Sequence, residues 1–332
     1  MDQVPAEVGR VHSRRDWGNP PWRIDFRPKR RRLPEKVDFA IVGAGFSGLA
    51  TAAWLRRVAP KKSVAVFEAG RIGAGSSGHT GGIALPETAA GDLPGLGDVL
   101  RGFRRILRAL RVNCDFEAGG VYELTHHSGA KHSPIRWADS GELRVAKSVP
   151  GGTVDPGKLV GGLALSAERW GAMIFEDARV EKIAHQRPLR LLVHGREVLA
   201  GRALVATNAM SLELSGLEGL GVPSGGRGIP KSRQRPNAGA DMRGPKFTLA
   251  VATRPLKASQ LNALGLSARR PFYTIDLPYL GAGCCLRTVS FLEAGSCVWR
   301  TGAGSRQYSS LKEKRRDCWH GCAIAFAGSI RR

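Results

Sequence analysis

The chain has 332 residues, of which 42% are hydrophobic, and this length allows one large domain or two ordinary ones with packed cores. The formal net charge of +23 would suit a protein that binds nucleic acid or an anionic membrane. However, the basic residues are spread along the chain, apart from one run at 27–32. This distribution favours a protein with a basic surface that binds an anionic cofactor. Only Cys114 lies in the first 283 residues, and no apolar segment follows the N-terminal arginines, so a secreted disulfide scaffold is excluded and we expect a cytoplasmic protein.

The first elements of the chain predict a polar arm followed by a βαβ unit. Residues 1–36 are polar and irregular, and we expect their Trp17 and Trp22 to pack onto the body of the protein rather than to bind a ligand. A strand, a helix and a second strand are then predicted at Val37–Val42, Ser47 to about Arg57, and Ser63–Ala69. Strands joined in this way through a helix are parallel.

Further helices and strands follow. An amphipathic surface helix is predicted at Val99–Val112, with Asp98 as its N-cap and a solvated face of arginines. Strands are predicted at Gly119–Thr125 and Arg202–Ala209, in KFTLAVATRPL from Lys246 and in RPFYTIDLPYL from Arg270; Val154–Ile183 reads as a helix and a strand, and Val222–Lys246 as a long loop.

The turn between the first strand and the helix carries the most specific motif. Gly43-Ala44-Gly45-Phe46-Ser47-Gly48 matches G-x-G-x-x-G, and Glu68 closes the second strand 20 residues after Gly48. Gly43 permits the tight turn, Gly45 lets the backbone approach a pyrophosphate, and Gly48 lets the helix pack close to the strand. The helix N-terminus offers N–H groups to the phosphates, and Glu68 can accept hydrogen bonds from ribose hydroxyls but repels a 2′-phosphate. The motif predicts an adenine dinucleotide other than NADP; the alternative is a glycine-rich turn without a ligand.

Two neighbouring features sharpen this interpretation. Asp38 and three glycines interrupt the apolar segment Val37–Leu55, so we expect no integral membrane segment there. A second glycine-dense segment, EAGRIGAGSSGHTGGIA, runs from Glu68 to Ala84 and is not needed in a plain NAD site. FAD is longer, and its isoalloxazine ring must lie against bare backbone, so this segment favours FAD.

The two motifs resemble those of the FAD-dependent D-amino-acid oxidase and glycine oxidase superfamily, especially its amine-oxidising branch. Its members continue after the first motif with E-x-x-x-x-G-x-G-x-S-x-x-x-G-G, which is filled here by Glu68, Gly73, Gly75, Ser77, Gly81 and Gly82. The resemblance extends through VDPGKLV at Val154, ARVEKI at Ala178, ALVATNA at Ala203 and PFYTIDLPYL at Pro271, and so covers about Val37–Leu280.

The resemblance implies an α/β fold with a Rossmann-like FAD-binding domain and a second, mostly antiparallel α+β substrate domain. The FAD-binding domain would be discontinuous, with residues 37–90 and 150–215, and the substrate domain would use 91–149 and 216–280. FAD-contacting residues implied in the same way are Gly43, Gly45, Phe46, Ser47, Gly48, Glu68, Ala69, Arg71, Ser77, Thr80, Gly81, Gly82, Val180, Thr207 and Asn208. His79 is a candidate proton acceptor, with a structural hydrogen-bond donor as the alternative.

The chemistry implied by the resemblance is oxidation of the C–N bond of an amine or amino acid, with hydride transfer to the flavin and O₂ as acceptor. It agrees with the absence of a Ser/His/Asp or metal constellation in the sequence, because the protein mainly binds, orients and polarises. Arg270 and Tyr273 are candidates for substrate-facing residues, with ordinary strand residues as the alternative. The rival functions are an inactive flavoprotein remnant and a nucleic-acid-binding protein driven by charge.

The resemblance ends after about residue 280. Members continue with a strand hairpin and a glycine-rich segment that closes over the flavin, whereas here the composition changes abruptly at 281–332 and five cysteines gather. The pattern CWHGC at Cys318–Cys322 lacks a second pair of metal ligands, so we expect no metal site. Our hypothesis is that the chain is truncated or frameshifted here and lacks the family hairpin. A chosen set of codons for Gly283–Cys297, read two bases in, would encode such a hairpin. The nucleotide sequence of the gene tests this hypothesis.

Overall fold

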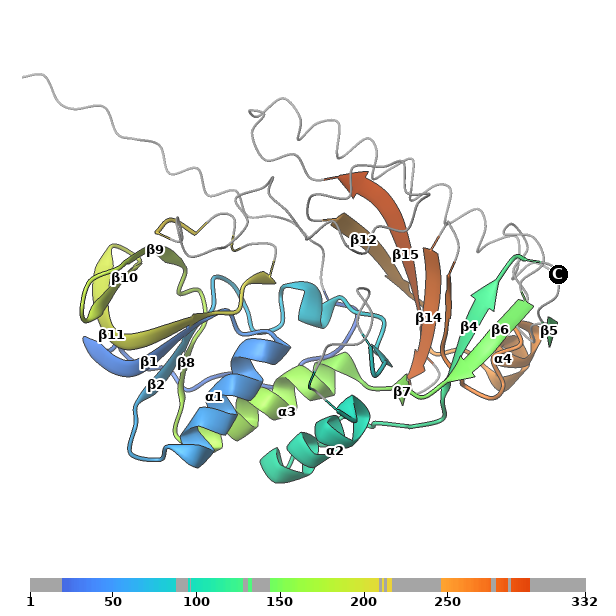
Figure 1. Ribbon diagram of the computed structural model, residues 1–332, viewed down its shortest axis with the longest axis horizontal. Coiled ribbons are helices and arrows are strands. Elements are labelled where there is room, and N and C mark those ends of the chain that lie inside the picture. Colours follow the sequence, from blue (N-terminus) through green and yellow to red (C-terminus); the bar gives the residue numbers. More distant parts are fainter. Residues whose placement is uncertain are drawn as a thin grey trace, which may run out of the picture.

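Segments far apart in the sequence form two large sheets and one two-stranded sheet in the computed structural model (Figure 1). It describes residues 20–87, 95, 97–127, 131–132, 144–208, 211, 214–216, 246–275, 279–285 and 288–298. The predicted loop at 222–246 falls almost entirely outside these residues, as do Trp17 and the CWHGC pattern.

The first sheet has six strands in the order β8-β2-β1-β11-β10-β9. At its centre, β1 (Lys36–Val42) pairs in parallel with β2 (Val64–Phe67) and with β11 (Arg196–Val205), while β2 pairs in parallel with β8 (Met173–Phe175). The predicted βαβ unit is therefore confirmed. All four residues of β2 are buried, as expected for an apolar strand covered on both faces.

Two helices pack together against one face of this sheet, α1 (Phe46–Val58) and α3 (Pro156–Arg169), and Figure 1 shows them side by side. The buried residues of α1 are small or aliphatic (Gly48, Leu49, Ala52 and Ala53), so the helix can approach the strands closely. The α3 helix begins at an Asp155 cap, whose side chain accepts a hydrogen bond from Lys158 N at 2.9 Å.

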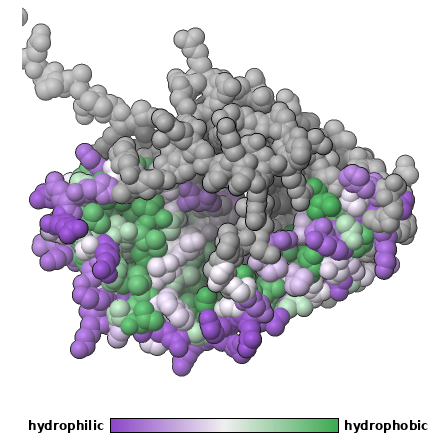
Figure 2. Space-filling view, viewed as in Figure 1, coloured by the Kyte–Doolittle hydropathy of each residue, from purple (hydrophilic) through white to green (hydrophobic). Residues whose placement is uncertain are grey.

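The predicted surface helix is α2 (Val99–Leu110), and its predicted cap is confirmed because Asp98 accepts a hydrogen bond from Arg101 N at 2.8 Å. Leu107 and Leu110 are buried, and the arginines 101, 104, 105 and 108 are exposed. Hydrophilic residues line the lower edge of the molecule in Figure 2, where Figure 1 places α2.

The sequence predicts a meander at the edge of the first sheet only in part, with strands at the end of Val154–Ile183 and at Arg202–Ala209 but none at β10. β9 (Val180–Ala184) and β10 (Leu189–Val193) run antiparallel, and β10 pairs antiparallel with β11, which begins at Arg196 rather than at the predicted Arg202. The connecting residues His194 and Gly195 have φ of 50° and 70°. Two consecutive positive φ angles are typical of a hairpin turn, and the His-Gly pair was the sequence signal for it.

The second sheet has seven strands in the order β12-β15-β14-β13-β4-β6-β5. Its pairs are antiparallel except for the parallel pairing of β13 with β4, so the predicted fold class, an α/β fold with a second, mostly antiparallel sheet, is confirmed. Its strands are β4 (Val121–Thr125), β5 (Lys131–His132), β6 (Arg144–Val149), β12 (Lys246–Ala252), β13 (Phe272–Thr274), β14 (Tyr279–Cys285) and β15 (Thr288–Val298). The short helix α4 (Ala258–Ala263) packs on one face of this sheet through Leu261.

The hairpin expected to be missing after residue 280 is present. β14 pairs antiparallel with β15 from Tyr279 to Cys285, and β15 continues to Val298. The expectation of a missing hairpin was therefore wrong, because TVSFLEAGSCV, despite its unusual composition, supplies enough β-branched and aromatic residues to form a strand. Residues 299–332 lie outside the described part, and the frameshift stays a hypothesis.

Gly48 gives a test of the strand–turn–helix packing. A Cβ at this position would collide with the backbone carbonyl of Gly43, so we expect Gly48→Ala to lower the free energy of unfolding by about 1–3 kcal/mol. Gly102 lies in α2 with no atom within 4 Å of its added Cβ, so Gly102→Ala should instead stabilise the protein by about 0.5–1 kcal/mol. Urea unfolding of both variants measures the difference; equal effects would contradict the close packing at Gly48.

Candidate cofactor site

The glycine turn at the tip of β1 lies among three strand ends. Gly43 N donates to Phe67 O of β2 at 2.8 Å, and Ala206 N, after β11, donates to Val42 O at 2.8 Å. Gly43 has φ of +104°, and a Cβ there would lie 2.7 Å from Ala206 O, so only glycine fits. The turn is thereby fixed where the first strand meets its two parallel neighbours.

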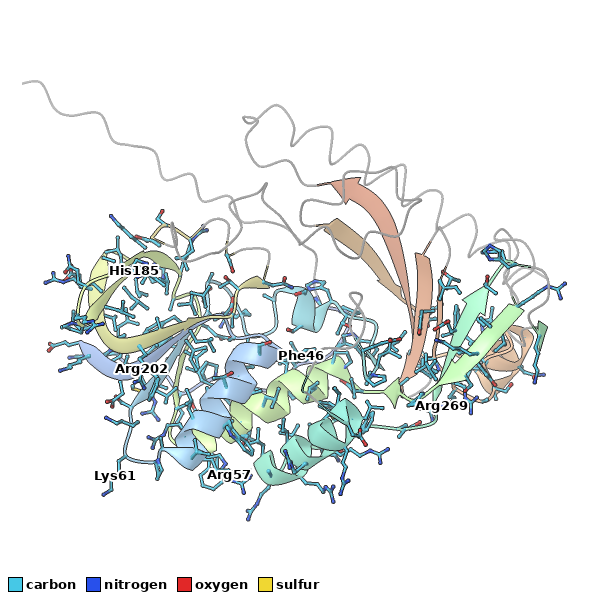
Figure 3. All side chains as sticks on the ribbon, viewed as in Figure 1. Phe46, Arg57, Lys61, His185, Arg202 and Arg269 are labelled. Carbon is cyan, nitrogen blue, oxygen red and sulfur yellow. The ribbon has the colours of Figure 1, made fainter. Side chains whose placement is uncertain are left out.

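The start of α1 faces the second glycine-dense segment. Gly45 is the N-cap and offers no side-chain hydrogen bond, while Phe46 N donates to Ser77 Oγ at 3.0 Å. A Cβ on Gly45 would lie 2.7 Å from the same Ser77 oxygen. The first-turn amides at Ser47 and Gly48 have no intrahelical acceptor, so this bare helix end fits an anion such as a diphosphate (Figure 3, Phe46).

Glu68 closes the site on the β2 side. Its Oε2 accepts from Ala44 N at 2.8 Å and its Oε1 accepts from Gly70 N at 3.0 Å. Burial of the carboxyl group raises its pKa, and the two backbone N–H groups oppose that shift. A carboxylate has about four acceptor positions. Capacity therefore remains on both oxygens for the two hydroxyl groups of a ribose.

The second glycine-dense segment is held by parts of the chain on both sides of it. Trp22 Nε1 donates to Thr80 O at 2.8 Å, and Val154 N donates to Gly82 O at 2.8 Å. Gly81 and Gly82 are buried, and Gly82 has φ of +75°. They lead into β3 (Ile83–Ala84), which pairs with β7 (Gly152–Thr153).

Trp22 supports this site in a way that the sequence analysis did not predict. The prediction that it packs onto the body is confirmed, since only 7% of its surface is exposed. Its hydrogen bond to Thr80, however, joins residues 58 apart in sequence and has no local pattern. The arm thus supports the segment that follows η1 (Ser76–Gly78).

Arg71 lies beside the site, but its charge is engaged by acids of the protein. Arg71 Nη1 is 2.7 Å from Glu176 Oε2, and its Nη2 is 3.8 Å from Asp177 Oδ2. Glu176, which the sequence analysis also missed, accepts from Ile72 N at 2.9 Å as well. These bonds hold the turn after Glu68, so Arg71 acts on the site through the position of that turn.

The remaining predicted contacts gather around the same strand ends. Ala178 N donates to Glu68 O at 2.7 Å and Asp177 N donates to Gly70 O at 2.8 Å, which holds Ala69 between them and brings Val180 beside the end of β2. Asn208 Nδ2 donates to Ser76 Oγ at 3.2 Å, and Thr207 Oγ1 lies 2.8 Å from Ser211 Oγ.

His79 hydrogen-bonds within the second glycine-dense segment. Its Nδ1 lies 2.9 Å from Gly75 O. A carbonyl oxygen only accepts, so this contact places a proton on Nδ1 and makes that nitrogen a structural donor. In a neutral imidazole Nε2 is then the acceptor, so the candidate role of His79 as a proton acceptor stays a prediction.

The two substrate-side candidates lie on opposite faces of the second sheet. Arg270 lies 4.6 Å from the Tyr122 ring centroid and bonds Ser148 Oγ at 3.4 Å. Tyr273 instead donates to Glu123 Oε2 at 2.8 Å, and the next residue along β4 from Glu123, Leu124, packs in the cluster beneath α4. Because neighbouring strand residues face opposite sides, the structure separates Arg270 from Tyr273.

A surface groove among the described residues lies away from the glycine turn. It has a volume of about 770 Å³ and is lined by Pro86, Pro150 and the start of α2, including the exposed Arg101, Arg104 and Arg108. None of the glycine-turn residues lines it. Within the described ranges no group of His, Cys, Asp and Glu could hold a metal ion, and no helix there combines the length and apolar composition of a membrane span.

Comparisons with known proteins agree with this architecture. The sequence model of the family described as FAD dependent oxidoreductase matches residues 38–234. A search of curated protein sequences finds no match.

Three of the solved structures with a similar fold illustrate the likeness. Glycine oxidase from Geobacillus kaustophilus is 17% identical with a TM-score of 0.56, and the match covers 82% of this chain and 76% of that one. L-proline dehydrogenase from P. horikoshii is 17% identical with a TM-score of 0.58, and the match covers 87% of this chain and 77% of that one. L-amino acid deaminase from Proteus vulgaris, with a specific insertion deleted, is 14% identical with a TM-score of 0.53, and the match covers 80% of this chain and 70% of that one. At these identities the likeness shows a common fold.

Trp22 provides a test of the supported segment. Trp22→Phe keeps an aromatic ring but removes the donor to Thr80 O, so we expect a loss of about 1–3 kcal/mol in the free energy of unfolding. The matched control is Trp170→Phe, because Trp170 is 41% exposed and the change should stay within about 0.5 kcal/mol. The denaturant midpoints of the two variants measure the difference. A change at Trp22 as small as that of the control would show that its hydrogen bond to Thr80 O does not stabilise the segment.

Proposed function

Since this chain belongs to the family of FAD-dependent oxidoreductases, within the D-amino-acid oxidase and glycine oxidase superfamily, we propose that it oxidises the C–N bond of an amine or amino acid, with FAD as hydride acceptor and O₂ as final acceptor. The observation that supports this most directly is the contact of the half-buried Glu68 carboxylate with Ala44 N inside the glycine turn. It joins an acceptor for ribose hydroxyls to a backbone that fits a diphosphate.

The residues of the turn would hold the diphosphate. Gly43 and Gly45 leave the backbone bare, and the first-turn amides of α1 at Ser47 and Gly48 would donate to the phosphates, beside Phe46, whose N–H is donated to Ser77 Oγ. Ser77 Oγ, already an acceptor from Phe46 N, can donate its own proton to a phosphate oxygen. No lysine or arginine is required at this end, because the helix end supplies the positive potential.

Glu68 would accept hydrogen bonds from the ribose, with Ala69 and Val180 beside it. The backbone bonds between the segments after Glu68 and before Val180 fix this edge before any ligand binds. Such preorganisation removes part of the ordering cost of binding. Thr207 and Asn208, at the end of β11, would line the neighbouring side of the cofactor.

Thr80, Gly81 and Gly82 would lie along the ring system. Hydrogen bonds to Trp22 and Val154 fix this segment on both sides, and the absent side chains of Gly81 and Gly82 permit close contact. The second sheet, which meets β3 through Gly281 and Ile83, would cover the reacting face and exclude water.

The alternative is a protein that keeps the cofactor fold without turnover. The family match ends at residue 234, and the composition changes after about residue 280. This alternative and the oxidase share cofactor binding and differ in turnover. Peroxide release on addition of amines or amino acids to the flavin-loaded chain separates them.

Cofactor binding is tested on the purified chain by flavin absorbance and by titration with FAD. We expect Glu68→Gln to raise the Kd for FAD about 10- to 100-fold, the loss of a hydrogen bond to a charged group being about 1.5–3 kcal/mol. The control is Glu197→Gln, an exposed carboxylate on β11 that bonds only Arg190 among the described residues and should leave the Kd unchanged. A wild-type chain that takes up no FAD would overturn the proposed function.

A further inference from the structure

One face of the second sheet points toward the strand that follows the glycine-dense segment. A Cβ added to Gly281 in β14 would lie 3.7 Å from Ile83 Cδ1 and 3.7 Å from Tyr273 Cβ. A Cβ added to Gly151 would lie 2.6 Å from Val121 Cγ2 and 2.6 Å from Ala84 O. Val121 and Tyr273 therefore lie on the side of the sheet that faces β3, directly after Gly81 and Gly82.

Glu123 lies on this same face. It is two residues from Val121 along β4, and it is the register partner of Tyr273 on β13 and of Lys147 on β6. The opposite face of these strands, with Leu124 and Phe272, is filled by the cluster beneath α4. A row of three polar side chains thus crosses the sheet on the side of the proposed cofactor.

The central member of this row is a buried carboxylate. Glu123 is 8% exposed, and its Oε2 accepts from Tyr273 Oη at 2.8 Å and lies 3.4 Å from Lys147 Nζ. Both contacts use one oxygen, so Oε1 keeps its acceptor capacity. Burying a carboxylate is costly unless it is fully paired, and a purely structural position would be served better by an apolar residue.

The charges around Glu123 favour a cation over an anion. Lys147 is 60% exposed and lies at the rim, where water screens it. Burial raises the pKa of the Tyr273 phenol, and the carboxylates of Glu123 and Glu87 raise it further, so Tyr273 stays protonated and keeps donating to Glu123. Two carboxylates, Glu123 and Glu87, thus act on this phenol, and among the described residues the ammonium group beside Glu123 is that of the exposed Lys147.

We propose that Glu123, positioned by Tyr273, is the specificity-determining residue that receives the cationic amino group of the substrate, so that the enzyme acts on amines without an α-carboxylate. This inference rests on the proposed function and narrows its substrate class. A free amino acid would bring its own carboxylate near Glu123, and two like charges in a shielded site repel each other. Arg270, which could attract such a carboxylate, lies on the opposite face.

The experiment uses the FAD-loaded chain and ligands matched in size: butylamine, butyrate and both enantiomers of 2-aminobutyrate. Binding is measured by calorimetry and by the change in flavin absorbance, so the result does not depend on turnover. We expect butylamine to bind most tightly, Glu123→Gln to raise its Kd about tenfold or more, and Tyr273→Phe, which keeps the charge, to raise it less. Glu197→Gln is the control and should change none of these values.

The outcomes separate this inference from the proposed function. Uptake of FAD by wild type and Glu123→Gln alike, with equal thermal midpoints, shows that the variant is folded and loaded. If butylamine then binds both equally, or if 2-aminobutyrate or butyrate binds wild type more tightly than butylamine, the specificity assigned to Glu123 is wrong while the flavoprotein stands. Failure of the wild type to bind FAD overturns the proposed function and this inference with it.

Discussion

The hydrogen bond from Ala44 N to Glu68 Oε2 is the contact on which the arrangement of the first sheet's strand ends depends. It joins the turn after β1 to the end of β2 at the side where both parallel strands stop. Glu68 also donates its own N–H to Phe175 O of β8 at 2.9 Å. One residue therefore aligns three parallel strands. Because its carboxyl group is largely removed from water, losing one of these hydrogen bonds would lower the free energy of unfolding. A residue needed for cofactor recognition is in this way also a structural residue.

A second consequence of this alignment is that the two glycine-dense segments meet. Gly73 N donates to Ala44 O at 3.1 Å, and Ser77 Oγ reaches the first amide of α1. Glycine is costly in conformational entropy, and a chain with many glycines must restrain them by tertiary bonds. Here the restraint comes from Trp22 and Val154, which hold the carbonyl groups of Thr80 and Gly82. The bare backbone is thus fixed by neighbours rather than by its own side chains.

Local patterns predicted the βαβ unit, the Asp98 cap and the parallel pairing, because periodicity, capping and crossover geometry are properties of short segments. They did not predict Trp22, Glu176 or Glu123 as parts of a site, since each acts across more than 50 residues or through a register partner. They placed Arg270 with Tyr273, yet pairing with β4 and β6 sends the two side chains to opposite faces. The hairpin β14–β15 was missed for another reason: composition was weighed above strand propensity.

The place where the family resemblance ends separates two properties of the molecule. The residues proposed for the diphosphate and the ribose lie between Gly43 and Asn208, all before the change in composition. Gly281, in contrast, belongs to β14, and a Cβ added to it would lie 3.7 Å from Ile83 Cδ1, so the strand at the change in composition lies beside the strand that follows the proposed cofactor segment. Alterations after residue 280 should therefore act on substrate access and on the exclusion of water, while the affinity for the adenosine half of FAD depends on the earlier part of the chain. Cofactor binding and turnover can consequently be lost independently in this fold.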